Sequence, residues 1–352
     1  MYFENAMEKE FYYRLQSQTV DWLRFPLIVL VMLIHVDHYS LMSLNASHAA
    51  YGIYFFFSQI LSRIAVPTFF LFSGYFFFFV KNSADGFTPA VYKQKLRSRI
   101  KTLLIPYLFW NLLMLVLKIA AAKGVNGEIL SQIKGFPFPP AIQFWYICDL
   151  MIFALVSPVL YVLIRKFKSY FVFLLGLLWL SDSGFWADNS LFFFCLGAYF
   201  SVTNKNMVEQ VRKLKFWPVI AFALLLIADT AVNIAPYKSV HTASNNTYLH
   251  CLCIFAGVVS VLYLTSLMIE RRRIAANPVL KSSLFFLFAA HPPVIVYAFT
   301  RPLIKFVPDN SLGFLIMYVF PVVACTAFLT GLFTLMKKKC PAFLSFICGG
   351  RI

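Results

Sequence analysis

Long apolar segments recur along almost the whole chain, and they constrain its fold more than any other feature. A helix needs about 20 apolar residues to cross a lipid bilayer. Ten segments reach or approach that length, near residues 20–42, 54–80, 102–122, 144–164, 169–181, 190–202, 216–235, 248–269, 283–300 and 312–336. The fifth and sixth segments are short, which leaves open whether they cross fully. We therefore predict an all-α polytopic membrane protein with about ten transmembrane helices.

The composition supports a lipid environment for most of this surface. Hydrophobic residues make up 61% of the chain and charged residues 13%. Soluble domains contain about 45–50% apolar and about 25% charged residues, so water alone could not solvate this chain. The first twenty residues carry acids and lack an apolar core with a cleavage site, so no signal peptide is expected.

The formal net charge of +17 reflects membrane topology better than nucleic-acid binding. The basic residues form short clusters between apolar segments, at 81–101, 165–168, 205–215, 271–281 and 337–351. Every second linker is basic, which is the pattern that cytoplasmic loops show. An even number of helices with both termini in the cytoplasm fits this alternation. We expect one membrane domain over residues 1–352, with cytoplasmic tails at 1–18 and 337–352, and no nucleic-acid partner.

The seven cysteines predict neither a disulfide framework nor a zinc site. No two of them form a CxxC pair, and most lie inside apolar segments. A cysteine in such a position packs as a small hydrophobic residue. We expect no metal ion and no tightly bound cofactor.

A few ionisable residues lie where lipid-spanning helices are expected. Such residues cost roughly 2.5–3.5 kcal/mol each on insertion scales, so they face protein or a water-filled cavity and become functional candidates. They are Arg24, His35, Asp37 and His38 in the first helix, Arg63 in the second, Asp149 in the fourth, Asp229 in the seventh and His291 in the ninth.

Arg24 and His35 are placed to line one face of the first helix. They are eleven residues apart, which returns a helix to within about 20° of its starting direction after a rise of roughly 16 Å. Arg24 lies near the cytoplasmic entrance and His35 past the midplane. Arg63 and Asp149 reach a depth similar to that of His35. Sequence leaves open whether these groups meet laterally.

These residue types suggest acyl transfer to a hydroxyl group. A neutral imidazole can accept the proton of a hydroxyl that attacks a carbonyl, and a nearby acid can orient the ring. An arginine can stabilise an oxyanion or bind a phosphate. In the alternative interpretation, Arg24 extends to the membrane surface and His35 is a hydrogen-bonded core histidine.

Several motifs in order resemble those of the bacterial membrane acyltransferase-3 family. They are Arg24 and His35 separated by ten residues, the stretch Arg63 to Tyr75, the approach to the third helix from Arg97 to Asn111, the segment Phe144 to Leu150 with Ser157-Pro158, His291-Pro292, and the ending from Leu344 to Arg351. The resemblance covers nearly the whole chain. It departs at Ser73-Gly74, which we interpret as small packing residues rather than a nucleophile.

The resemblance implies an O-acetyltransferase of cell-surface polysaccharide precursors. Acyl-CoA, usually acetyl-CoA, is then the donor and co-substrate, and a glycan or lipid-linked sugar hydroxyl is the acceptor. The resemblance further implies that His35 is catalytic and that Arg24 handles the donor, and Arg63 matches the family's second-helix arginine. Asp149 completes the catalytic set, although only some family members carry it. The expected location is the bacterial inner membrane, in contact with its lipids.

Other residues are candidates for donor or substrate binding. Asp21 lies beside Arg24, and His38 lies about 60° around the helix from His35. Trp145 belongs to an interfacial aromatic belt or contacts a sugar face, and His291 is structural or lines the cavity. Three basic residues near the expected entrance are weaker candidates for donor phosphates: Lys95, Arg97 and Arg99.

Two other function classes remain open from the sequence. A proton-coupled transporter or flippase of polysaccharide precursors would use Arg24, His35, Asp149 and Asp229 as a protonatable pathway. It would move its substrate without consuming a thioester. A membrane scaffold for polysaccharide assembly would carry no chemistry at His35.

Overall fold

The computed structural model describes residues 2–80, 87–121, 124–135, 142–181, 190–240, 247–272 and 274–352. All regular elements within these residues are helices. Eight helical stretches are long and apolar enough to cross a membrane: Met7–Ile34, His48–Phe78, Pro89–Ala120, Trp145–Phe167, Trp217–Ile234, Tyr248–Arg272, Pro278–Leu303 and Ser311–Lys339. Two shorter apolar helices, α9 (Ser169–Leu180) and α10 (Ser190–Val202), coincide with the two short segments of the sequence. The prediction of an all-α polytopic membrane protein is confirmed.

The first helix differs from its predicted bounds at both ends. α1 (Tyr2–Ile34) begins within the segment expected to be a tail and stops before residue 42. Asp37 then starts the short helix α2 (His38–Met42), and the Ser40 hydroxyl donates a hydrogen bond of 2.7 Å to its carboxylate. Asp is common at this position before a helix, and here its carboxylate accepts from the Ser40 hydroxyl rather than from a backbone amide of α2. His35 therefore lies at the end of α1 rather than inside it.

Three of the long stretches contain irregular turns. The second consists of α3 (His48–Phe55), the π-helical η1 (Phe56–Ile60), the 3₁₀ turn η2 (Leu61–Ile64) and α4 (Ala65–Phe78). The third joins α5 (Pro89–Arg99), η3 (Ile100–Leu104) and α6 (Ile105–Ala121), so the basic linker is helical and continuous with the span. The seventh joins α14 (Pro278–Pro293), η5 (Val294–Thr300) and α15 (Arg301–Leu303).

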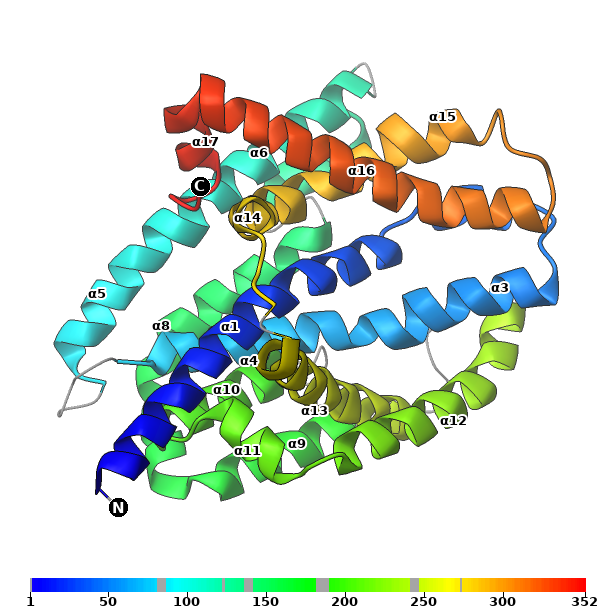
Figure 1. The fold of residues 1–352 in the computed structure, drawn as a ribbon. Coiled ribbons are helices and arrows are strands. Elements are labelled where there is room, and N and C mark those ends of the chain that lie inside the picture. The colour runs from blue at the N-terminus through cyan, green and yellow to red at the C-terminus, as the bar shows by residue number, and fades with distance from the viewer. Residues whose placement is uncertain are drawn as a thin grey trace.

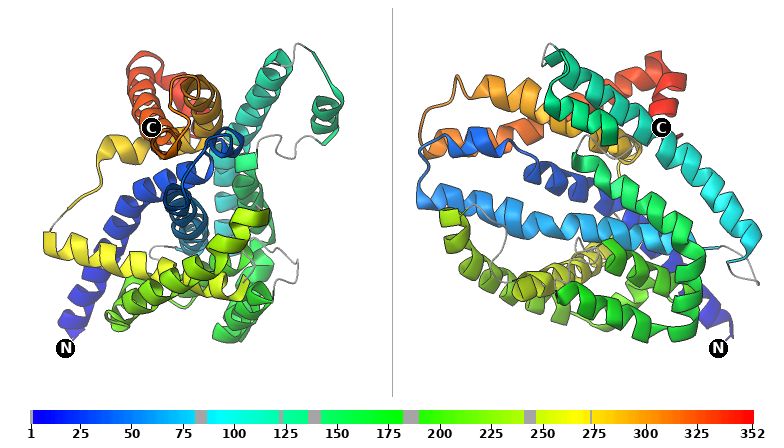
Figure 2. Two further views of the ribbon diagram at one scale, coloured as in Figure 1. Left: turned by 90° about the vertical axis from the view of Figure 1, so that its right-hand side faces the viewer. Right: turned by 180° about the vertical axis from the view of Figure 1, so that it is seen from behind.

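The remaining elements complete the bundle. They are α7 (Gly127–Gly135), η4 (Ile142–Phe144), α8 (Trp145–Phe167), α11 (Met207–Lys213), α12 (Trp217–Val240), α13 (Thr247–Arg272), α16 (Ser311–Lys339) and α17 (Pro341–Ile347). α1 runs through the middle of the bundle and contacts α4, α13, α14 and α16 (Figure 1). Both marked ends of the chain lie toward the same end of the bundle, which the view from behind also shows (Figure 2).

Two glycines allow α4 and α10 to approach backbone to backbone. A Cβ atom on Gly74 would lie 1.9 Å from the carbonyl oxygen of Phe194. A Cβ atom on Gly197 would lie 2.0 Å from the carbonyl oxygen of Leu71. Small residues at such contacts are typical of helices that pack within membranes. This contact fixes the position of α4, whose opposite residues reach the functional site described below.

Large apolar side chains cover the outside of the bundle. Exposed examples lie on α8, α9, α12 and α16: Leu155, Val159, Phe173, Leu177, Leu224, Ile227, Val323 and Phe328. An exposed apolar surface of this extent fits lipid as the surrounding solvent. The polar groups discussed next lie on the inner side of the bundle.

Candidate active site

A cavity of about 310 Å³ lies between α1, α4, α8 and α14. One of its walls is a single stripe of α1, formed by Arg24, Ile28, Val31 and His35. Their spacing of four, three and four residues keeps them on one face of a helix. The structure thus brings the two residues of the first-helix motif into the same cavity.

The other walls are mostly apolar and aromatic. α4 contributes Val66, Phe69, Phe72, Ser73 and Phe76; the helices at 99–103 and 143–150 contribute Arg99, Leu103, Gln143, Trp145, Tyr146, Ile147 and Leu150; α14 and the segment after α17 contribute Lys281, Ser282, Leu284, Phe285, Phe288 and Arg351. An apolar cavity with a few convergent polar groups is the usual form of a small-molecule site.

His35 is held in one tautomer by its own helix. Its Nδ1 lies 2.8 Å from the carbonyl oxygen of Val31. A carbonyl oxygen only accepts hydrogen bonds, so Nδ1 carries the proton of the neutral ring. Nε2 then holds a lone pair and can act as a base. This is the state that proton abstraction from a hydroxyl requires.

A second histidine packs against His35. The ring centroids of His35 and His291 are 5.0 Å apart, and the rings are nearly perpendicular. Nδ1 of His291 donates to the carbonyl oxygens of Leu287 and Phe288, at 3.1 and 2.9 Å. Its Nε2 is buried and has no hydrogen-bond partner among the described residues. His291 is not part of the cavity wall, so it contacts the site through His35.

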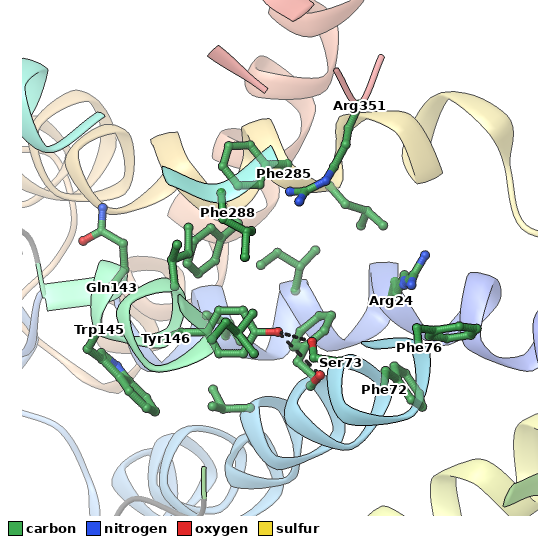
Figure 3. A pocket seen from close by; sticks show the side chains of 18 of the residues that line it. Arg24, Phe72, Ser73, Phe76, Gln143, Trp145, Tyr146, Phe285, Phe288 and Arg351 are labelled. Carbon is green, nitrogen blue, oxygen red and sulfur yellow. Dashed lines mark hydrogen bonds between the residues drawn. The ribbon is translucent and has the colours of Figure 1, made fainter. Parts of the chain in front are cut away.

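Four basic side chains gather in the cavity away from His35. They are Arg24, Arg99, Lys281 and Arg351, from α1, α5, α14 and the segment after α17. Figure 3 shows Arg24 and Arg351 reaching the same end of the cavity from opposite walls. Asp21, just outside the wall, accepts from Arg24 at 3.4 Å and from Lys281 at 2.6 Å. The cavity therefore combines a base with a strongly cationic end.

A hydroxyl pair lies along the cavity wall. The hydroxyl groups of Tyr146 and Ser73 are 3.0 Å apart, and that of Tyr146 also donates to the carbonyl oxygen of Phe69 at 3.4 Å (Figure 3). The positive charges of Arg24, Arg99 and Arg351 all act on the Tyr146 hydroxyl. Ser73 is thus a cavity residue, whereas its neighbour Gly74 serves packing as the sequence indicated.

Of the three weaker candidates for binding donor phosphates, only one lines the cavity. Arg99 and the aromatic candidate Trp145 line the cavity. Lys95 does not; its ammonium donates to the carbonyl oxygens of Phe76 and Phe79 at 3.2 and 2.9 Å and so closes the end of α4. Arg97 is exposed and lies outside the cavity wall.

Three further candidates also lie outside the wall. Arg63 donates to the side-chain oxygen of Gln59 at 2.5 Å, and its positive charge acts on the neutral His35 ring. Asp149 is absent from the cavity wall, although its neighbours Ile147 and Leu150 belong to it. The Nδ1 atom of His38 is 3.2 Å from the Tyr54 hydroxyl.

Sequence reasoning missed Lys281 and Arg351 as cavity residues, and it did not place Tyr146 in the cavity. Lys281 was counted as topology-determining charge, and Arg351 only as part of a resembling tail. Gly349-Gly350 directly before Arg351 was an available signal, because paired glycines permit a sharp turn back into the protein. Among the described residues, no three His, Cys, Asp or Glu side chains are grouped to hold a metal ion.

The arrangement is suited to a reaction between an anionic reactant and a proton-donating one. The cationic end can bind negative charge, and His35 can accept a proton about three helical turns away along α1. The walls between them are mainly apolar and aromatic.

Comparison with known proteins identifies a family for the chain. A family model described as an acyltransferase domain, that of the acyltransferase-3 family, matches residues 18–330. Neither the curated proteins nor the solved structures include a significant match to the chain. The matched region contains the cavity-lining residues of α1, α4, α8 and α14, including both residues of the first-helix motif, whereas Arg351 lies beyond it. The chain belongs to the acyltransferase-3 family of membrane acyltransferases.

Proposed function

We propose that this acyltransferase moves an acetyl group from acetyl-CoA to a hydroxyl group of a cell-surface glycan or its lipid-linked sugar precursor. The observation that carries the proposal is one cavity with His35 at one part of its wall and four basic residues at another. The basic side faces the compartment that supplies acetyl-CoA, which we take to be the cytoplasm of a bacterium. The acceptor reaches His35 from the opposite side of the membrane.

The reaction uses the lone pair on Nε2 of His35. That lone pair is available because the proton of the neutral ring is on Nδ1, which donates to the Val31 carbonyl oxygen. The acceptor oxygen attacks the thioester carbonyl while Nε2 of His35 takes the hydroxyl proton. The carbon–sulfur bond then breaks, and the departing thiolate takes that proton to give free CoA. If His35 instead carries the acetyl group transiently, Nε2 attacks the thioester carbonyl and CoA leaves as the thiolate. The acceptor hydroxyl then attacks the acetyl group, the bond from Nε2 to the acetyl carbon breaks, and the hydroxyl proton passes to the thiolate.

The decisive experiment replaces His35 in purified protein reconstituted into liposomes. Transfer of labelled acetyl from acetyl-CoA to a membrane glycolipid fraction is measured, together with release of free thiol. We expect His35→Ala to lower transfer by at least about 100-fold, because general base catalysis contributes 10²–10⁴-fold. Activity close to that of the unchanged protein would refute the proposal.

His48→Ala is the matched control, because His48 is an exposed histidine at the start of α3. Its transfer activity should remain unchanged. The elution volume and helical circular dichroism of both variants establish that the bundle is folded. Transport of the precursor driven by a pH gradient, with no thiol released, would instead identify a transporter.

A further inference from the structure

α17 and the residue that follows it dock firmly on the bundle. Leu344, Ile347 and Cys348 are almost fully buried. The indole nitrogen of Trp110 donates to the carbonyl oxygen of Ile347 at 2.9 Å. This segment therefore has a fixed place beside α6, from which the next residues turn toward the cavity.

Two glycines make that turn. Gly349 and Gly350 have φ values of +62° and +81°, a region that other residues rarely adopt. A Cβ atom on Gly349 would also lie 2.6 Å from the carbonyl oxygen of Thr102. The turn is closed by a hydrogen bond of 2.8 Å from the Gly350 amide to the Ser345 carbonyl. It directs Arg351 into the cavity wall.

Arg351 is then held next to other positive charges. Its guanidinium carbon lies 4.9 Å from the ring centre of Phe285. Burial, and then the nearby charge of Arg99, lowers the pKa of Arg351 to about 10, so it stays charged at neutral pH. Arg24 adds to this repulsion. The described cavity wall contains no carboxylate, and Asp21 outside it pairs with Arg24 and Lys281.

Several arginine side chains that lie close together without a carboxylate between them repel one another. A polyanion that binds between them relieves this repulsion. Guanidinium groups match phosphate oxygens with two parallel hydrogen bonds. We propose that Arg24, Arg99 and Arg351 together bind the phosphate groups at the nucleotide end of the acyl donor, and that the glycine turn delivers Arg351 to complete this site. The inference rests on the proposed function, which supplies a phosphate-bearing thioester as the donor.

If this site binds phosphate groups, the protein should prefer thioester donors that carry phosphates. A thioester of pantetheine carries the same reacting atoms as acetyl-CoA but lacks phosphates. The protein should therefore use acetyl-CoA with a KM at least about tenfold lower than that for acetyl-pantetheine. Losing one charged hydrogen-bonding partner of a phosphate typically costs about tenfold or more in affinity.

The test compares Arg351→Gln and Arg99→Gln in phosphatidylcholine nanodiscs. Binding of adenosine 3′,5′-bisphosphate should weaken at least about tenfold in each. The KM for acetyl-CoA should rise similarly, so that the preference for acetyl-CoA over acetyl-pantetheine shrinks. Arg165→Gln removes an exposed arginine of α8 and should alter neither. Binding within twofold of the unchanged protein in a folded Arg351→Gln sample would overturn the proposal.

Two further arms separate the possible failures. The measurements are repeated in nanodiscs that contain phosphatidylglycerol. A loss of affinity confined to these anionic discs would assign the arginines to lipid headgroups and overturn the proposal. Equal use of acetyl-CoA and acetyl-pantetheine would overturn the phosphate site and leave acyl transfer standing. Arginine-dependent binding without transfer from either thioester would support the site and contradict the proposed function.

Discussion

At the scale of single residues, His35 and His291 are held by the same kind of hydrogen bond. Each donates Nδ1–H to a carbonyl oxygen of its own preceding turn, of Val31 for His35 and of Leu287 and Phe288 for His291. Each imidazole is thereby fixed in orientation and keeps its lone pair on Nε2. His291 is fully buried and packs edge-on against His35, so it limits the positions that the His35 ring can take.

This contact predicts that His291 positions the base. Replacing His291 with Phe keeps an aromatic ring but changes its size and removes both backbone hydrogen bonds. A small misplacement of a reacting group can cost about 100-fold in rate. We expect kcat to fall about 10- to 100-fold while the KM for acetyl-CoA stays within about twofold, as measured by steady-state kinetics in liposomes.

The alternative from the sequence was a role for His291 in donor or substrate binding. That role would raise the KM for the donor and spare kcat, and such a result would contradict the positioning role. His291→Gln provides a second variant, because its amide can still donate to a backbone carbonyl. It should recover part of the lost kcat.

The sequence could indicate that Arg24 and His35 share a cavity, because both belong to the first helical segment. Within one helix, the spacing of two residues determines whether they lie on the same face. The same reasoning could not unite His35 with His291 or Arg24 with Arg351. The members of each pair are more than 250 residues apart and meet only through tertiary packing. Hydrophobic periodicity within one segment does not predict such contacts. Asp149 illustrates the opposite error, because similar depth in the membrane did not bring it to the cavity wall.

At the scale of elements, hydropathy located the helices well but not their interruptions. The apolar segment at 20–42 continues through Leu41 and Met42, so its average does not register the end of α1 at Ile34. Asp37 was the available signal, since its side chain favours a helix start. The interruption places His35 where one helix ends, with the rest of the α1 stripe leading toward Arg24.

The contact between α4 and α10 makes an element-scale prediction. Gly197→Ala places a methyl group 2.0 Å from the carbonyl oxygen of Leu71, so the two helices must separate. Overpacking of this kind costs roughly 1–3 kcal/mol. We expect a lower unfolding temperature in detergent and a lower transfer rate, because α4 carries Val66, Ser73 and Phe76 into the cavity wall.

The matched substitution is Gly331→Ala in α16. A Cβ atom there meets nothing within 4 Å, and alanine favours a helix over glycine by about 1 kcal/mol in water. Its unfolding temperature should stay equal or rise. If the unfolding temperature of Gly197→Ala equals that of Gly331→Ala, the backbone contact between α4 and α10 does not limit the stability of the protein.

At the scale of the whole molecule, charge and apolar surface divide the protein into distinct zones. Leu224, Ile227 and Phe328 belong to the apolar outer surface, while Arg24, Arg99 and Arg351 converge inside. The basic clusters at the ends of α8, α13 and α16 give the bundle a polarity. The positive-inside rule predicts that these ends face the cytoplasm. The cationic part of the cavity lies between α1, α14 and the segment after α17, so the donor should enter from that side.

This polarity predicts that acetyl-CoA acts from one side of the membrane only. Acetyl-CoA is polyanionic and does not cross a sealed bilayer unaided, because charged groups are costly in lipid. In inside-out vesicles, added acetyl-CoA should support transfer at full rate. In right-side-out vesicles the rate should be at least about tenfold lower, and permeabilisation with detergent should restore it. Equal rates in both sealed preparations would show that the arginines are open to the opposite side, and the proposed separation of donor and acceptor entry would then be wrong.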